Sequence, residues 1–217
     1  MTLGKAFFVV VLVVAMPAAA ADSDIPELMK AAGNGNVALV QQFVANDASL
    51  ALAKDATGRT ALHRAGTKQV AEALIAAKAD LNATAGFGQT PLWEAASDGR
   101  EGAVEALLAA GAKTDVAASD GSTALHRAAT FNEGGIAQRL IAAHAGVSVK
   151  DDRGRTPLAT AAARCKKVVV QLLVSAGSDL NARDGEGRSP LELAMQCRAS
   201  EGKEAILAVL RPAPTAP

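Results

Sequence analysis

The chain has 217 residues with 22 basic and 22 acidic side chains, so its formal net charge at pH 7 is zero. A balanced charge offers no electrostatic footprint for nucleic acid or for an anionic membrane surface, and we expect neither as a partner. The chain contains no Tyr and one Trp, while Ala, Leu and Val are abundant. This composition favours helices that pack through small residues over aromatic-rich strands.

The first 21 residues have the layout of a secretory signal peptide. Lys5 supplies one positive charge, residues 6–16 form an unbroken apolar run, and residues 18–21 are the small residues that a cleavage site needs. The run is shorter than the roughly 20 residues of a membrane-spanning helix, and an uncleaved anchor is the alternative. We expect cleavage after Ala20 or Ala21, which predicts a periplasmic or secreted protein with no membrane attachment after cleavage.

A tetrapeptide that begins with Thr or Ser recurs five times at nearly constant spacing. Successive copies start 30, 33, 33 and 33 residues apart, and a Gly lies two residues before each copy. The copies are Thr60-Ala61-Leu62-His63, Thr90-Pro91-Leu92-Trp93, Thr123-Ala124-Leu125-His126, Thr156-Pro157-Leu158-Ala159 and Ser189-Pro190-Leu191-Glu192. An apolar pair downstream, first seen at Leu74-Ile75, recurs after 33, 33 and 32 residues. Two independent series with one period indicate an internal repeat.

Each repeat unit predicts two helices and a turn. The Thr or Ser is a helix N-cap, whose side-chain oxygen accepts an unpaired backbone N–H. Pro in the next position suits the first helical turn, where its missing N–H costs nothing. The second helix carries the apolar pair and ends at Gly111 or Gly177, where a left-handed residue closes a helix. A turn such as residues 184–187 then leads into the next unit.

This pattern resembles the ankyrin repeat, which has a 33-residue period and a T-P-L-H-x-A signature. The resemblance covers about residues 24–211 and implies an all-α solenoid of about six helix-turn-helix units with hairpin-like turns between them. We place one solenoid over residues 22–211, with units that start near residues 24, 56, 86, 119, 152 and 185. The end units are less regular, as solenoid ends that face water are. Residues 212–217 are expected to form a disordered tail.

Two departures from the pattern carry structural predictions. Leu62 and Leu74 are 12 positions apart, whereas the matching Leu92 and Leu107 are 15 apart. The unit that starts at Thr60 must therefore have a shorter first helix or a shorter turn between its helices. Lys78 and His144 stand where other units have Gly. If the backbone is left-handed there, each side chain costs about 1 kcal/mol.

The sequence offers no recognisable catalytic, metal or cofactor site. His63 and His126 lie in the fourth position of the tetrapeptide, where the resemblance implies hydrogen bonds within and between repeats. They are two repeats apart, too far to share a metal ion. There is no phosphate-binding glycine loop, no serine-nucleophile motif and no pair of carboxylates in a catalytic context. We therefore expect no enzyme and no cofactor.

The two cysteines, Cys165 and Cys197, lie near the ends of the first helices of adjacent units. An even number of cysteines in an exported chain invites a disulfide. A disulfide requires Cα atoms within about 7 Å, and neighbouring helices usually lie about 8–10 Å apart. An insertion near Arg198–Lys203 would let Cys197 approach its neighbour. Both a disulfide and two buried thiols remain open.

The resemblance implies that a partner binds at the turn tips and on the concave face of the first helices. Phe87, Trp93 and Phe131 stand out in a chain with few aromatic residues, and we hypothesise that they form an aromatic centre. The rim of this centre is expected to be formed by Arg59, Arg127, Arg153 and Arg155. The alternative is that Trp93 and Phe131 fill space between repeats. The candidate partner-binding residues are Arg59, Phe87, Gln89, Trp93, Asp120, Arg127, Phe131, Arg153, Arg155 and Arg164.

The functional prediction is an exported ankyrin-repeat protein, monomeric by itself, that mediates a protein–protein interaction through these surfaces. The alternative is a periplasmic inhibitor or immunity protein that occludes an enzyme or a toxin. In both cases the partner is a protein whose identity cannot be read from the sequence, because repeat surfaces are generic supports for specificity.

Overall fold

The computed structural model describes residues 21–197 and 202–211. The signal peptide predicted for residues 1–21 lies almost wholly outside this range, as do the predicted tail at residues 212–217 and most of the predicted insertion. The described residues form twelve α-helices and one short 3-10 helix: α1 (Ala21–Gly33), α2 (Val37–Asn46), η2 (Ala48–Ala51), α3 (Ala61–Arg64), α4 (Lys68–Ala76), α5 (Pro91–Ser97), α6 (Glu101–Ala109), α7 (Ala124–Phe131), α8 (Gly134–Ala142), α9 (Pro157–Ala163), α10 (Lys167–Ser175), α11 (Pro190–Gln196) and α12 (Lys203–Leu210).

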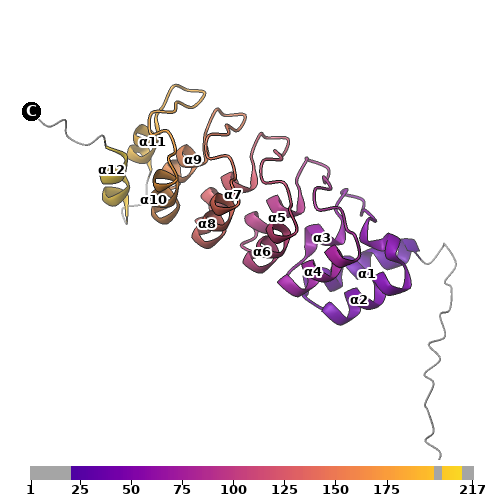
Figure 1. The fold of residues 1–217 in the computed structure, drawn as a ribbon. Coiled ribbons are helices and arrows are strands. Elements are labelled where there is room, and N and C mark those ends of the chain that lie inside the picture. The colour runs from indigo at the N-terminus through magenta and orange to yellow at the C-terminus, as the bar shows by residue number, and fades with distance from the viewer. Residues whose placement is uncertain (1–20, 198–201, 212–217) are drawn as a thin grey trace, which may run out of the picture.

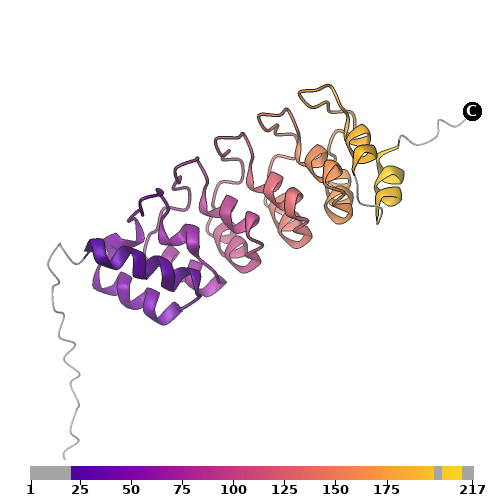
Figure 2. The ribbon, with the colours of Figure 1, turned by 180° about the vertical axis from the view of Figure 1, so that it is seen from behind.

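The α-helices pair in chain order, from α1 with α2 to α11 with α12, and the pairs stack in one elongated row (Figure 1). Long loops join successive pairs, and all of them project from the same side of the row, which the reverse view also shows (Figure 2). Each helix packs against its partner and against the matching helices of the neighbouring pairs. The predicted all-α solenoid of about six units is confirmed.

The core runs along the whole row and is built from the two series that the sequence repeats. In four units the Leu of the tetrapeptide and a Leu of the second helix are no more than 1% exposed. These residues are Leu62, Leu92, Leu125 and Leu158 in the first helices and Leu74, Leu107, Leu140 and Leu173 in the second helices. Small Ala residues such as Ala96 and Ala129 are also fully buried and let the helices approach closely.

The capping chemistry expected at the helix starts is present. The Thr90 and Thr156 side chains accept the backbone N–H groups three residues on, at Trp93 and Ala159. Pro91 follows Thr90 as the first helical residue. In the loops, one carboxylate oxygen of Asp55 accepts the N–H groups of Thr57 and Arg59, which holds the turn that projects from the row.

Both predicted departures from the regular repeat are found. α3 has only four residues, and Arg100 of the next unit donates hydrogen bonds to the carbonyl oxygens of His63 and Ala65 where that helix ends. Lys78 and His144 have φ angles of 66° and 60°, in the left-handed region. The missing residues thus shorten the first helix, and the two side chains sit in the strained conformation that Gly adopts elsewhere.

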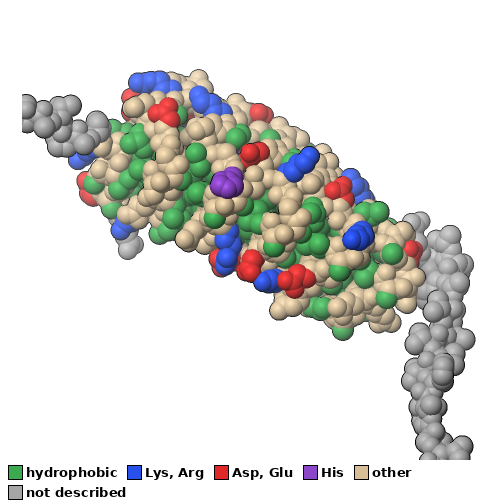
Figure 3. All heavy atoms as spheres, viewed as in Figure 1, with side chains coloured by type: hydrophobic (Ala, Val, Ile, Leu, Met, Phe, Trp, Pro, Cys, Tyr) green, Lys and Arg blue, Asp and Glu red, His purple; other side chains and the backbone are tan. Residues whose placement is uncertain are grey.

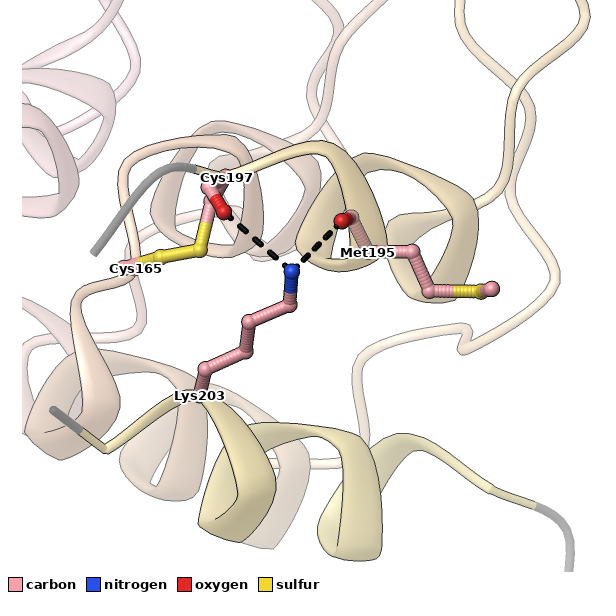
Figure 4. Close-up of a disulfide and its surroundings, with 4 residues drawn as sticks. All are labelled: Cys165, Met195, Cys197 and Lys203. Atoms are coloured by element: carbon pink, nitrogen blue, oxygen red, sulfur yellow. Dashed lines mark hydrogen bonds between the residues drawn. A yellow bond between two sulfur atoms is a disulfide. The ribbon is translucent and has the colours of Figure 1, made fainter. Parts of the chain in front are cut away.

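Cys165 and Cys197 form a disulfide, which decides between the two alternatives (Figure 4). Their Cα atoms are 6.0 Å apart. Cys165 lies beyond the end of α9 in a left-handed conformation (φ 55°), and Cys197 lies just beyond α11. Both cysteines lie where the chain leaves its helix. The usual distance between helix axes therefore does not limit how closely their Cα atoms approach. Lys203 donates to the carbonyl oxygens of Met195 and Cys197 at 2.7 and 3.3 Å.

Candidate protein-binding surface

An arginine lies between two aromatic rings in the middle of the row. The guanidinium carbon of Arg127 is 4.5 Å from the ring centre of Trp93 and 4.9 Å from that of Phe131. Such cation–π contacts are attractive because the ring faces carry partial negative charge. Arg127 belongs to α7 with Phe131, whereas Trp93 belongs to α5, so the stack spans two units. The stack therefore holds Arg127 between the two rings.

Trp93 also makes a hydrogen bond that the tetrapeptide histidines make in other units. Its indole Nε1 donates to the carbonyl oxygen of Ser122 at 3.1 Å and to the Ser122 hydroxyl at 3.0 Å. In the same position, His63 Nε2 lies 3.1 Å from the carbonyl oxygen of Gln89, and His126 Nε2 lies 2.9 Å from that of Arg155. Trp93 thus joins neighbouring units, as the space-filling alternative required, while the side chain remains partly exposed.

Phe87 projects from the loop that precedes α5, and 72% of its surface is exposed. The Gln89 side chain accepts the Phe87 backbone N–H at 3.2 Å, which shapes this turn. Phe87, Gln89, Trp93, Asp120 and Arg127 line one open hollow of about 380 Å³. Five of the candidate residues, from two loops and two helices, are therefore brought together.

Phe131 contributes a second exposed aromatic surface beside this hollow. It is 48% exposed at the end of α7, next to Asn132, which closes the helix in a left-handed conformation. Because nearly half of its surface faces solvent, Phe131 does more than fill space between repeats. Its ring packs against one side of Arg127.

Arg59 lies at the edge of this group and is tied to the scaffold. Its Nε atom donates to a carboxylate oxygen of Glu94 at 2.6 Å, and the Glu94 side chain is buried. This hydrogen bond raises the pKa of the Arg59 guanidinium above its usual value. Arg59 also lines a neighbouring hollow with Phe87 and Gln89.

The other candidate arginines surround a separate, smaller hollow of about 190 Å³. Arg127, Arg153, Arg155 and Arg164 line it together with acidic residues that include Asp120. Arg155 also lies 3.6 Å from a carboxylate oxygen of Asp184. Burial lowers the pKa of the Arg127 guanidinium; the charge of Asp120 partly offsets this, and the like charge of Arg164 adds to it. The two hollows share Arg127 and Asp120 and adjoin one another.

Sequence reasoning missed the residues that hold these groups in place. Asp184 is buried and pairs with Arg188 at 2.8 Å; burial alone would raise its pKa, but hydrogen bonds from Arg188 and from backbone N–H groups lower it to about 2. Glu94 occupies the position that is Arg64 and Arg127 in the adjacent units. A carboxylate at a repeat position that holds arginine in the units before and after was the sequence signal that could have singled out Glu94.

Within the described ranges, no helix is both long and apolar enough to cross a membrane. The same residues contain no group of three or more His, Cys, Asp or Glu side chains placed to hold a metal ion. His63 and His126 are instead occupied by hydrogen bonds to the backbone of the next unit.

Comparison with known families agrees with this architecture. The family model described as ankyrin repeats (3 copies) matches residues 64–151 and again residues 129–212, which together span more than half of the chain. No curated protein matches the chain.

Proposed function

Because the chain belongs to the ankyrin-repeat family, whose members are binding scaffolds rather than enzymes, we propose that it is an exported scaffold that holds one protein partner. The partner binds at the aromatic surface, defined as Phe87, Gln89, Trp93, Arg127 and Phe131. The observation that carries this proposal is the exposure of two large aromatic rings beside a stacked arginine.

The composition of the aromatic surface supports the proposal. Aromatic residues and Arg are the types most enriched among residues that dominate binding energy. Of the three Phe in the described residues, Phe87 and Phe131 are among the most exposed large hydrophobic side chains. Each Å² of aromatic surface that a partner removes from water makes the free energy of binding more favourable by about 25 cal/mol. Grouped exposure of this kind marks interaction sites.

Two further features support export. The N-terminal sequence has the layout of a signal peptide. The Cys165–Cys197 disulfide suits an oxidising compartment such as the periplasm or the extracellular space, because cytosolic thiols are kept reduced.

The proposal is tested by partner capture with matched variants. The mature protein, immobilised and exposed to periplasmic extract, is compared with Phe87→Ala and Phe131→Ala, and bound proteins are identified by mass spectrometry. Because the rings are hot-spot types, each variant is expected to weaken retention of the true partner at least about tenfold. Met195→Ala removes an exposed apolar side chain (59% exposed) near the C-terminal end and is expected to keep full retention.

Circular dichroism provides the control for folding, since both rings project from the surface and their removal leaves the core intact. Full retention by Phe87→Ala and by Phe131→Ala would contradict the proposed surface. If the captured partner is an enzyme, its activity with and without the protein separates a scaffold from an inhibitor.

A further inference from the structure

The small hollow beside the aromatic surface has walls rich in guanidinium groups. We call it the arginine hollow and define it by Arg127, Arg153, Arg155 and Arg164. Arg127 comes from α7, Arg153 and Arg155 from the loop before α9, and Arg164 from the end of α9. Figure 3 shows basic side chains, with a few acidic ones, gathered on the projecting loops near α9 and α11. Two adjacent units thus converge on one basic hollow.

Three acidic residues, Asp120, Asp151 and Asp152, line this hollow beside its four arginines. A fourth carboxylate, Asp184, lies 3.6 Å from Arg155 but is itself paired with Arg188 at 2.8 Å. Asp120 accepts hydrogen bonds from the backbone and hydroxyl of Ser122. One oxygen of Asp151 accepts the backbone N–H groups of Arg153 and Arg155 at 3.0 and 2.8 Å. Both carboxylates hold their own turns, so one oxygen of each is already used. The third, Asp152, is exposed.

The hollow's lining residues also hold buried polar atoms that make no hydrogen bond in the described part of the chain. The Nε atom of Arg127 and the hydroxyl of Thr160 are buried and lack a hydrogen bond there. The Nε atom of Arg155 also lacks one and makes only the ion pair with Asp184, at 3.6 Å. A guanidinium can only donate hydrogen bonds. A buried donor left unpaired costs free energy. The four guanidinium groups that line the hollow offer more donors than its three carboxylates accept, which favours an occupant that accepts hydrogen bonds.

The size of the hollow narrows the choice of occupant. Its volume of about 190 Å³ is below the roughly 300–1,000 Å³ of small-molecule sites. A single carboxylate side chain fits this space and pairs with guanidinium groups through parallel hydrogen bonds. The adjoining aromatic surface supplies the apolar contact that the flanking residues of such a side chain need.

We propose that the arginine hollow receives a Glu or Asp side chain of the protein partner, while neighbouring apolar residues of that partner rest on the aromatic surface. This inference rests on the proposed function and deepens it, because it states the chemistry of the partner. The partner presents an acidic residue next to apolar residues, and charge complementarity selects it.

The test begins with a probe of known composition. A library of random 12-residue peptides displayed on phage is selected on the immobilised mature protein. The selected peptides are expected to contain an excess of Glu or Asp adjacent to apolar residues. One such peptide is then synthesised with its acidic residue intact and with Glu→Gln, and the loss of a charge-assisted contact is expected to raise Kd about tenfold or more.

Matched variants of the protein assign this effect to the hollow. Arg153 and Arg164 are exposed, so Arg153→Gln and Arg164→Gln leave the core intact. Each variant is expected to bind the Glu peptide more weakly and to show a smaller difference in Kd between the Glu and Gln peptides. Arg211→Gln makes the same charge change at an exposed position after α12, away from the hollow. It is expected to keep the full difference in Kd between the Glu and Gln peptides.

The outcomes separate this proposal from the function it rests on. Three outcomes would overturn the carboxylate proposal: selected peptides without an excess of Glu or Asp, equal binding of the Glu and Gln peptides, or a selection that yields no binders. So would saturable binding of inorganic phosphate in the hollow without binding of the Glu peptide. Partner capture that is insensitive to Phe87→Ala and Phe131→Ala contradicts the proposed function instead, whatever the peptides show.

Discussion

At the scale of single residues, the fourth position of the tetrapeptide shows how one contact constrains side-chain chemistry. Trp93 can only donate, and it donates to the backbone carbonyl of Ser122. His63 and His126 lie against the matching carbonyls through Nε2, while their Nδ1 atoms accept the N–H groups of Thr60 and Thr123. These four contacts require the neutral histidine with its proton on Nε2, since Nδ1 must accept.

This arrangement predicts a loss of stability in mild acid. Burial lowers the pKa of His63 and His126 below the ordinary value of 6.5. Their contribution is thus fully present above pH 6.5 and is lost as the pH falls toward the folded-state pKa, by at most about 1.4 kcal/mol per pH unit for each histidine. Urea unfolding from pH 7.5 to 5.5 should show a steeper decline for the wild type than for a His63→Gln/His126→Gln variant. Parallel declines would contradict the assignment.

The left-handed residues give a second prediction at this scale. Lys78 and His144 have positive φ, where a side chain costs about 1 kcal/mol and Gly costs little. Lys78→Gly and His144→Gly are therefore expected to raise the free energy of unfolding by up to about 1 kcal/mol, measured by urea denaturation. Gly111→Ala is the matched control: its added Cβ meets no atom within 4 Å, so the expected loss comes from φ alone. Unchanged or lower stability of both Gly variants would show that strain is absent.

At the scale of elements, the short helix α3 depends on its neighbour. A helix leaves its last carbonyl groups without partners within the helix. In α3 the Arg100 side chain supplies donors to His63 and Ala65, and Arg100 itself is the first residue before α6. The side chain of Arg100 is 15% exposed, and burial lowers the pKa of this guanidinium. The end of the shortened helix is therefore stabilised by the next unit, while the capping box of Thr60 and His63 stabilises its start from within.

The candidate binding surface likewise depends on contacts between neighbouring units. The aromatic stack forms because α5 and α7 lie side by side, so a Trp from one unit and an Arg and a Phe from the next meet. The loops add Phe87 from one side and Arg153 and Arg155 from the other. No single helix carries the surface, and it is complete only when the units stack.

At the scale of the whole molecule, each unit contacts only its neighbours, so an end unit has one neighbour where an inner unit has two. The last unit packs α11 on α9 and α12 on α10. The disulfide adds a covalent link between the ends of α9 and α11. We infer that this bond stabilises the C-terminal end, whereas the N-terminal end is held by noncovalent contacts, such as the hydrogen bond from Gly66 N–H to the carbonyl oxygen of Ala32.

Removal of the disulfide tests this asymmetry. The bond closes a loop with a sequence separation of 32, which in the chain-entropy treatment stabilises by about 3–4 kcal/mol. A Cys165→Ser/Cys197→Ser variant is expected to lose up to that amount in urea unfolding. Its amide hydrogen exchange should accelerate in α11 and α12 but not in α1 and α2. Equal acceleration at both ends, or none, would contradict a local role.

The sequence by itself determined the repeat, the paired helices, the shortened first helix at Thr60 and the left-handed positions of Lys78 and His144. These features follow from spacing and capping within one unit, where each residue acts on its close neighbours in the chain. The matching Leu series also predicted the core, because a constant period places the same face of every unit inward.

Only the tertiary structure decided which side chains meet between units. It joined Cys165 to Cys197, placed Arg127 between Trp93 and Phe131, and gathered the arginine hollow. The contacts between units join residues about 30 positions apart or more, as Trp93 with Arg127 and Cys165 with Cys197 do. They depend on the offset between stacked units and on the direction in which the chain leaves each helix, and neither quantity is written in the period of the repeat.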